Sequence, residues 1–162
     1  MNDSNATQMI DVGAKSDTQR EALASGAILM QRDTLEMVRQ STLPKGNALE
    51  TARVAAIMAA KNTPQLIPLC HPLLITHAGC DFACDAEGGA IRVTTRVRCR
   101  GKTGVEMEAL TAAAAALLTL YDMTKGVDDT LEIRAVRLLQ KRGGKSGEFV
   151  RSQSREGRVG RK

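Results

Sequence analysis

Two glutamates and an aspartate–lysine pair flank a long apolar stretch near the middle of the 162-residue chain. Glu106 and Glu108 precede a run of alanines and leucines, and Asp122 and Lys125 follow it. Carboxylates and lysines are side chains through which enzymes transfer protons in general acid–base catalysis. Spacing alone favours a simpler interpretation, in which these residues form an exposed ion pair and two solvated glutamates.

The apolar stretch between these groups predicts a helix over residues 109–125. Ala and Leu have a low cost of helix formation, and no Gly or Pro interrupts the run. Asp122 and Lys125 would share one face of this helix. Glu106 and Glu108 would point to nearly opposite sides of a helix but to the same side of an extended segment. We therefore predict that residues 104–108 are extended and that the helix begins at about Ala109.

Further polar side chains lie in predicted loops or at the ends of predicted elements, where binding residues concentrate. They are Arg20 before the first strand, Lys45 between Pro44 and Gly46, His71 among prolines, and Lys145 among glycines. Cations that face carboxylates would suit a polyanionic substrate undergoing proton transfers.

The glycine-rich segment KRGGKSG, residues 141–147, does not fit a Walker phosphate loop. Leu139 occupies the position where that loop needs its first glycine, and no helix is predicted to follow. Backbone amides and one lysine can still bind an anion. An anion-binding loop and a flexible exit from the domain are equally compatible with the residues.

A cluster of thiols and imidazoles raises the question of a zinc site. Its members are Cys70, His71, His77, Cys80 and Cys84. Structural zinc sites usually take ligand pairs from a knuckle or a helical turn, but no C-x2-C pair occurs and the last two cysteines lie in a predicted strand. We expect reduced, buried thiols and no metal.

Composition predicts a cytoplasmic protein with one hydrophobic core. Hydrophobic residues make up 43% of the chain, no apolar run reaches membrane-spanning length, and the N-terminus lacks the pattern of a signal peptide. Of the net charge of +5, a net +3 lies in residues 148–162, and aromatic side chains are scarce. We expect disordered ends at 1–8 and 148–162, and no nucleic-acid partner.

Periodicity and turn signals predict a single domain, residues 9–147. Its elements are strands at 21–31, 73–85, 90–100 and 130–140, and helices at 33–40, 47–61 and 109–125. Their order, β-α-β-β-α-β with an extra helix in the first crossover, predicts an α+β, ferredoxin-like fold. Helices would cover one face of a four-stranded antiparallel sheet, so the other face must be polar or meet another subunit.

Local signals set the expected boundaries. Asp33 and Asn47 are the expected N-caps of the first two helices. The second helix should end before Thr63 and Pro64, because proline does not continue a helix. Glycines between the second and third strands predict a hairpin, and a break in alternation predicts a bulge at Val136.

Many segments of the chain resemble the MoaC family, the cyclic pyranopterin monophosphate synthases of molybdenum cofactor biosynthesis. The matching segments are MIDVGAK (9–15), TARVAAIMAAK (51–61), LIPLCHPL (66–73), GKTGVEMEALTAA (101–113), YDMTK (121–125) and GGKSG (143–147). The resemblance implies a lyase that converts (8S)-3′,8-cyclo-7,8-dihydroguanosine 5′-triphosphate to cyclic pyranopterin monophosphate and pyrophosphate. It implies no metal or organic cofactor, and a homohexamer, a trimer of dimers, with active sites at subunit interfaces.

By position, the resemblance assigns central catalytic roles to Lys45, Asp122 and Lys125. Residues that would bind the substrate in the same pocket are Arg20, Cys70, His71, Glu106, Met107, Glu108 and Lys145, with Arg20 and Lys145 placed for the triphosphate. Our hypothesis is that Lys125, oriented by Asp122, is the principal acid and base, and that Lys45 assists proton transfer or binds phosphate.

One position departs from the family. It usually carries Asp at position 47, where this chain has Asn, which removes a negative charge beside Lys45. Two other functions compete with the enzyme: a noncatalytic nucleotide-binding sensor module of the same fold, and a zinc-bound interaction domain.

Overall fold

The third strand of the sheet shows most directly how the sequence specifies the fold. In the computed structural model, which describes residues 6–145 and 147–152, this strand is β3, Ala90–Gly101. Its alternate side chains are buried, and the arginines between them lie on the opposite, more exposed face. Such alternation is typical of an antiparallel sheet with one face against the core and the other toward solvent.

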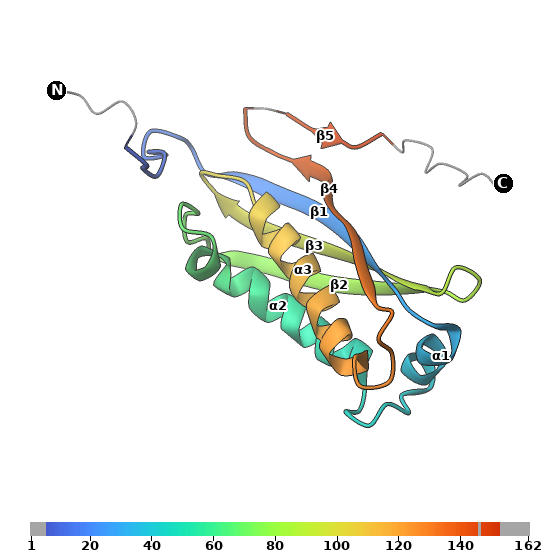
Figure 1. The fold of residues 1–162 in the computed structure, drawn as a ribbon. Helices are drawn as coiled ribbons and strands as arrows, with labels where there is room; N and C mark the ends of the chain where they lie inside the picture. Colours follow the sequence, from blue (N-terminus) through green and yellow to red (C-terminus); the bar gives the residue numbers. More distant parts are fainter. Residues whose placement is uncertain (1–5, 146, 153–162) are drawn as a thin grey trace.

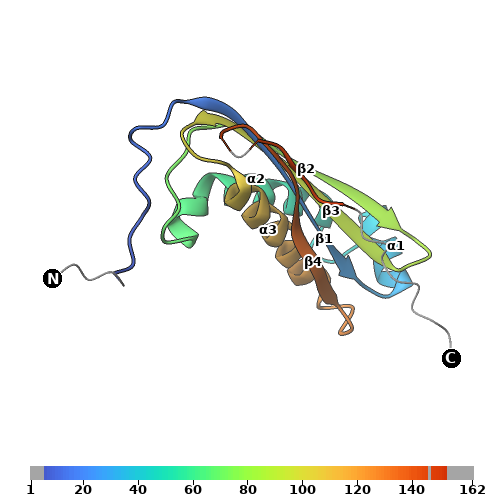
Figure 2. The same ribbon diagram turned by 90° about the horizontal axis from the view of Figure 1, so that it is seen from above.

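The order of elements confirms the predicted ferredoxin-like arrangement. The elements are β1 (Thr18–Leu29), α1 (Arg32–Gln40), α2 (Ala48–Leu66), β2 (Ile75–Asp85), β3, α3 (Glu106–Thr124), β4 (Glu132–Arg142) and β5 (Phe149–Val150). The sheet is antiparallel with the order β2-β3-β1-β4-β5. Helices α2 and α3 lie side by side on one face of the sheet (Figures 1 and 2).

The helical layer packs closely because small residues meet where the helices touch. Helix α2 buries Ala48, Ala52, Ala56 and Ala60, one residue in every turn. Helix α3 buries four alanines and two leucines of its own, and it contacts α2 and three strands. The small side chains of alanine allow the helix axes to approach closely.

Strand β4 is irregular where it crosses β1. Between its register positions opposite Ser25 and Ala27, β4 contains one extra residue, and Ala135 has a positive φ of 54°. The predicted bulge beside Val136 is therefore confirmed. A Cβ on Gly26, in the facing strand, would approach the Leu117 side chain of α3 to 2.5 Å, so glycine lets α3 cross β1 at this point.

Two predicted boundaries of the first two helices are wrong. Helix α2 continues through Pro64 to Leu66, and beyond the proline the Ile67 amide donates to the Thr63 carbonyl. The N-cap of α1 is Gln31, and Asp33 lies within the first turn. The predicted N-cap at Asn47 is confirmed, since its side chain accepts a hydrogen bond from the Glu50 amide.

The sheet has a fifth strand that the sequence did not predict. Phe149 and Val150 pair with β4, and the Arg142 side chain pairs with Glu148, so residues 148–152 are not the disordered tail that was expected. Two residues are too short for any alternation to be recognised. The remaining tail, 153–162, and residues 1–5 lie outside the described part of the chain. Within the described residues, no helix is long and apolar enough to span a membrane.

A buried carboxylate ties the end of α3 to the start of α1. Asp128 is only 4% exposed and accepts hydrogen bonds from the backbone amides of Gln31 and Thr130 and from the Thr130 hydroxyl. Burial alone would raise the pKa of Asp128, but these hydrogen bonds outweigh it and leave the pKa below its usual value.

Replacing Asp128 with alanine is expected to lower the free energy of unfolding by about 2 kcal/mol at neutral pH, because buried amides lose their charged acceptor. Since the folded-state pKa is the lower one, this stabilisation is complete above the unfolded pKa of about 3.9 and is lost as the pH falls through the folded value. Urea unfolding of wild type and D128A at several pH values checks this. The prediction fails if the free energies of unfolding of the two proteins differ by the same amount at neutral pH and in acid.

Candidate active site

Helix α3 begins earlier than predicted, and this changes how its two glutamates are positioned. Glu106 is the first residue of the helix, and Val105 is the N-cap, so the prediction that 104–108 is extended and that the helix starts at Ala109 is wrong. The first turn of a helix has unpaired amides and a positive dipole end, which favours carboxylates there. Glu106, Met107 and Glu108 still line one cavity, because they surround the open end of the helix.

This cavity, which we call the carboxylate cavity, has a volume of about 500 Å³. It lies between the start of α3, the proline-rich loop before β2, and the N-terminal segment. Its lining residues are Gln8, Ile10, Val12, Lys15, Leu69, Cys70, His71, Leu73, Thr103, Gly104, Glu106, Met107 and Glu108. The predicted residues Cys70 and His71 are thus brought together with the three residues of α3.

Burial controls the protonation of two groups in the carboxylate cavity. Glu108 is 3% exposed, and burial, aided by the charge of Glu106, raises its pKa. Burial and the nearby Glu108 likewise raise the pKa of the Cys70 thiol. Cys70 is therefore a neutral lining group rather than an activated nucleophile. Glu108 holds its proton to a higher pH than an exposed glutamate does, which suits a proton donor.

A second cavity of about 650 Å³ lies at the same end of the sheet, and we call it the cationic cavity. Six of its lining side chains are cationic: Lys15, Arg20, Lys102, Lys141, Arg142 and Lys145. Its two carboxylates are Glu21 and Glu106, so the lining carries a formal excess of four positive charges. Arg20 and Lys145 were predicted from the sequence, whereas the other four cations were not. These four lie at or just beyond the ends of strands β3 and β4 or in the N-terminal segment.

Arg20 organises the wall of the cationic cavity from within β1, because that strand begins at Thr18 and not after Arg20 as predicted. Its guanidinium donates hydrogen bonds to the carbonyl oxygens of Gly101 and Lys102, at 3.4 and 3.2 Å, and to that of Gly143, at 3.2 Å. Gly143 and Gly144 both have positive φ, and a Cβ on Gly144 would overlap the Arg20 guanidinium. The glycines therefore allow this loop to lie in close contact with Arg20. Ser146 lies outside the described residues.

The two cavities meet at Glu106. Lys15, Thr103, Gly104 and Glu106 line both of them. At this junction the Glu106 carboxylate pairs with the Lys141 ammonium at 3.0 Å. A molecule that extended from one cavity into the other would therefore pass beside this ion pair.

The remaining predicted residues form a separate cluster at the other end of α3. Lys45 contacts Asp122 Oδ2, and Lys125 contacts Asp122 Oδ1, both at 2.8 Å. Lys45 also donates to the backbone carbonyl of Asp122. All three side chains are about half exposed. Gly46 has a φ of 93°, a conformation that glycine adopts without strain and that brings Lys45 to the helix end.

Hydrogen bonds fix the charges of this cluster. Those from Lys125 and Lys45 lower the pKa of Asp122 to about 2, and Asp122 raises the pKa of Lys125. At neutral pH Lys125 is therefore an ammonium ion beside a carboxylate. In this state Lys125 can donate a proton, but it can accept one only after it has given up its own.

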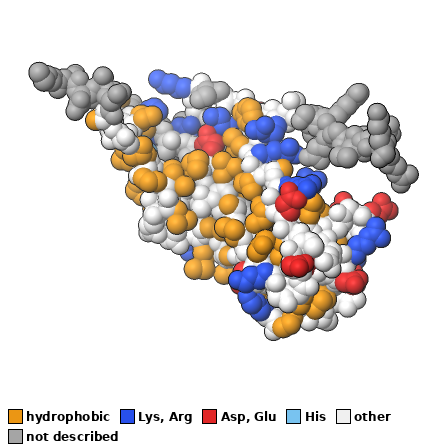
Figure 3. Space-filling view, viewed as in Figure 1, with side chains coloured by type: hydrophobic (Ala, Val, Ile, Leu, Met, Phe, Trp, Pro, Cys, Tyr) orange, Lys and Arg blue, Asp and Glu red, His pale blue; other side chains and the backbone are white. Residues whose placement is uncertain are grey.

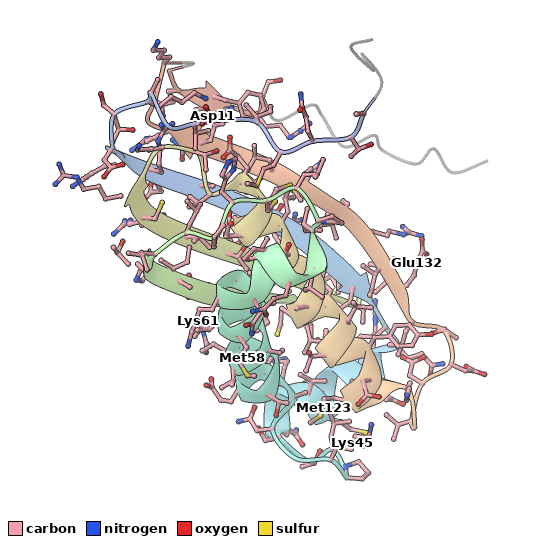
Figure 4. All side chains as sticks on the ribbon, turned by 90° about the vertical axis from the view of Figure 1, so that its left-hand side faces the viewer. Asp11, Lys45, Met58, Lys61, Met123 and Glu132 are labelled. Carbon is pink, nitrogen blue, oxygen red and sulfur yellow. The ribbon has the colours of Figure 1, made fainter. Side chains whose placement is uncertain are left out.

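One chain does not bring its two groups of residues into a common cavity. Glu106 and Asp122 lie sixteen residues apart on α3, which corresponds to about 24 Å along the helix axis. Figure 4 shows Lys45 beside Met123 at one end of the molecule and Asp11, whose neighbours Ile10 and Val12 line the carboxylate cavity, at the opposite end. Within the described residues, no three His, Cys, Asp or Glu side chains lie close enough together to hold a metal ion.

Comparison with known proteins assigns the chain to a family. The model of the MoaC family matches residues 9–144, which include every candidate site residue except Lys145. The chain belongs to the MoaC family. The MoaC match thus covers the lysine–aspartate cluster and all lining residues of the two cavities except Gln8 and Lys145.

Curated MoaC relatives match nearly the whole chain. The chain is 51% identical to the cyclic pyranopterin monophosphate synthase of Roseiflexus sp. (strain RS-1), over 93% of its own length and 95% of that protein. It is 52% identical to the synthase of Chloroflexus aggregans (strain MD-66 / DSM 9485), over 91% and 89% of the two chains. For the synthase of Desulfatibacillum aliphaticivorans the identity is 52%, over 88% and 90%.

Proposed function

We propose that this protein is a cyclic pyranopterin monophosphate synthase of molybdenum cofactor biosynthesis. It is a lyase that rearranges (8S)-3′,8-cyclo-7,8-dihydroguanosine 5′-triphosphate and releases pyrophosphate. The observation that carries this proposal is the junction of a cationic cavity with a carboxylate-lined cavity at Glu106, in a chain of the MoaC family. The junction suits a substrate with a polyanionic end and a ring system rich in N–H donors.

The cationic cavity holds the triphosphate. A triphosphate carries about four negative charges at neutral pH, which matches the formal excess of four positive charges around this cavity. When a hydroxyl of the same molecule displaces pyrophosphate from the first phosphorus, that phosphorus becomes the cyclic monophosphate. Lysines and arginines stabilise the charge that builds up on the departing pyrophosphate. The rearrangement needs no oxidant or reductant.

The ring system lies in the carboxylate cavity and undergoes proton transfers there. Glu106 accepts hydrogen bonds from the ring N–H groups, while Glu108, with its raised pKa, donates a proton or a hydrogen bond. Lys125, held as an ammonium by Asp122, is the second proton donor, and Lys45 assists it from the same cluster. Cys70, His71 and Met107 shape the cavity around the ring.

The active site is completed by a second copy of the chain. The separation of about 24 Å between Glu106 and Asp122 supports this, because a single substrate does not span it. A face for self-association is available: Val54 and Met58 of α2 and Leu118 of α3 are each more than half exposed, and hydrophobic side chains spread over this helical face (Figure 3). We propose that copies assemble as a homohexamer, a trimer of dimers, in which the lysine–aspartate cluster of one subunit faces the cavities of another.

The cytoplasmic location expected from the sequence belongs to the same proposal. The four cysteines are free thiols, and the two in the core, Cys80 and Cys99, have pKa values raised by burial. Buried, protonated thiols are usual in reducing compartments.

Incubation of the purified protein with the cyclic dihydroguanosine triphosphate tests the proposal. Mass spectrometry should detect cyclic pyranopterin monophosphate, and a phosphate assay should detect an equal amount of pyrophosphate. Binding of the substrate without conversion would instead support the noncatalytic sensor module. Stoichiometric metal in the purified protein would favour the zinc-bound interaction domain, and elemental analysis measures it.

A further inference from the structure

Lys141 occupies a special place between the two cavities. It lies near the end of β4, where its register partner is Ala22 of β1. Ala22 is fully buried on the helix-covered face of the sheet, so Lys141 points toward the start of α3, whereas its neighbour Arg142 lies opposite Glu21 on the other face. Strand alternation thus directs one basic side chain of this pair to the junction of the cavities.

The Glu106 carboxylate is held at this junction by contacts on two sides. One oxygen accepts the hydrogen bond from Lys141, and the other lies directly over Gly104, where a Cβ would overlap it. The side chains of Lys141 and Glu106 are 33% and 27% exposed. Solvent screens such a pair in part, so a stronger anion can replace the carboxylate as the partner of Lys141.

The other cations of the cationic cavity have different surroundings. Lys102 donates to the backbone carbonyl of Gly13, and Arg142 pairs with Glu148. Among the described residues, the side chains of Lys15 and Lys145 have no hydrogen-bond or ion-pair partner. Among the described cations of this cavity, only Lys141 pairs with a carboxylate that we propose to bind the ring system.

We propose that Lys141 is a positioning residue that exchanges partners when the substrate binds. In the free protein it holds Glu106, and in the complex it binds a phosphate oxygen of the triphosphate and releases the Glu106 carboxylate to the ring system. Binding of the triphosphate in the cationic cavity thereby frees Glu106 to bind the ring system in the carboxylate cavity. The inference rests on the proposed function for the identity of the full substrate, but the exchange itself requires only a polyphosphate.

Binding of inorganic triphosphate to the assembled protein, measured by calorimetry, tests the exchange without any turnover. K141Q should bind about tenfold more weakly, the equivalent of one lost charge-assisted hydrogen bond. E106Q should bind several-fold more tightly than wild type, because Lys141 is no longer held by a carboxylate. The double variant should bind as weakly as K141Q, since Glu106 acts on the phosphates through Lys141. K141R should restore most of the affinity.

E132Q is the matched control. It also removes a carboxylate from an ion pair, with Arg134 on β4, but Glu132 lines neither cavity, so affinity for triphosphate should stay at the wild-type value. Equal affinities of wild type and E106Q, or equal gains in E106Q and E132Q, would overturn the exchange. The proposed function fails separately, if wild type binds triphosphate in the expected pattern but does not convert the cyclic nucleotide.

Discussion

Replacing Lys125 with alanine is expected to lower turnover by about 10²- to 10⁴-fold, the range that a positioned proton donor contributes. In the structure Lys125 is an ammonium ion whose pKa is raised by Asp122, so the variant loses the proton that the cluster is built to supply. The side chain is about half exposed at the end of α3 and supports no part of the core. Folding and assembly should therefore be unchanged.

Turnover of K125A is measured by pyrophosphate release, with assembly checked by light scattering. K61A provides a matched control, because Lys61 is an exposed lysine of α2 that lines neither cavity and lies apart from the lysine–aspartate cluster (Figure 4). It should retain wild-type turnover. Full activity of K125A would contradict the role given to Lys125.

The fold was largely predictable because its strongest signals are local. The alternation of β3 and the alanine run of α3 each identified an element and its buried face from consecutive residues. The errors lie at the ends of helices and strands, where tertiary contacts or unpaired backbone groups determine which residue is the first or the last. The start of α3 is such a case: Glu106 and Glu108 were treated as isolated side chains, although the amides of a first helical turn favour carboxylates.

The residue types of the site were predictable, but their arrangement was not. Spacing along the chain does not reveal that Arg20 lies against Gly143 and Gly144, since this contact depends on the pairing of β1 with β4. For the same reason Lys141, the second-last residue of β4, was treated as part of a glycine-rich segment. Sequence resemblance also joined Lys125 and Glu106 in one pocket, whereas one chain holds them at opposite ends of α3.

Because we propose that one active site is built from two subunits, we expect activity to recover when two inactive variants are mixed. K125A lacks the cluster at one end of α3, and E106A lacks the carboxylate at the other end, where Glu106 is a first-turn residue with 27% side-chain exposure. In a mixed oligomer, an E106A subunit supplies an intact lysine cluster to the intact cavities of a K125A subunit. Each variant thus supplies the side chain that the other lacks.

The decisive measurement is the turnover of hybrids formed by coexpressing the two variants with different affinity tags and purifying on both tags in sequence. Random assembly should restore about one quarter of the wild-type activity, because one arrangement in four places both intact halves at the same site. Each parent alone should remain inactive. Hybrids no more active than the parents would contradict the two-subunit site and would mean that each chain carries out the reaction with its own residues.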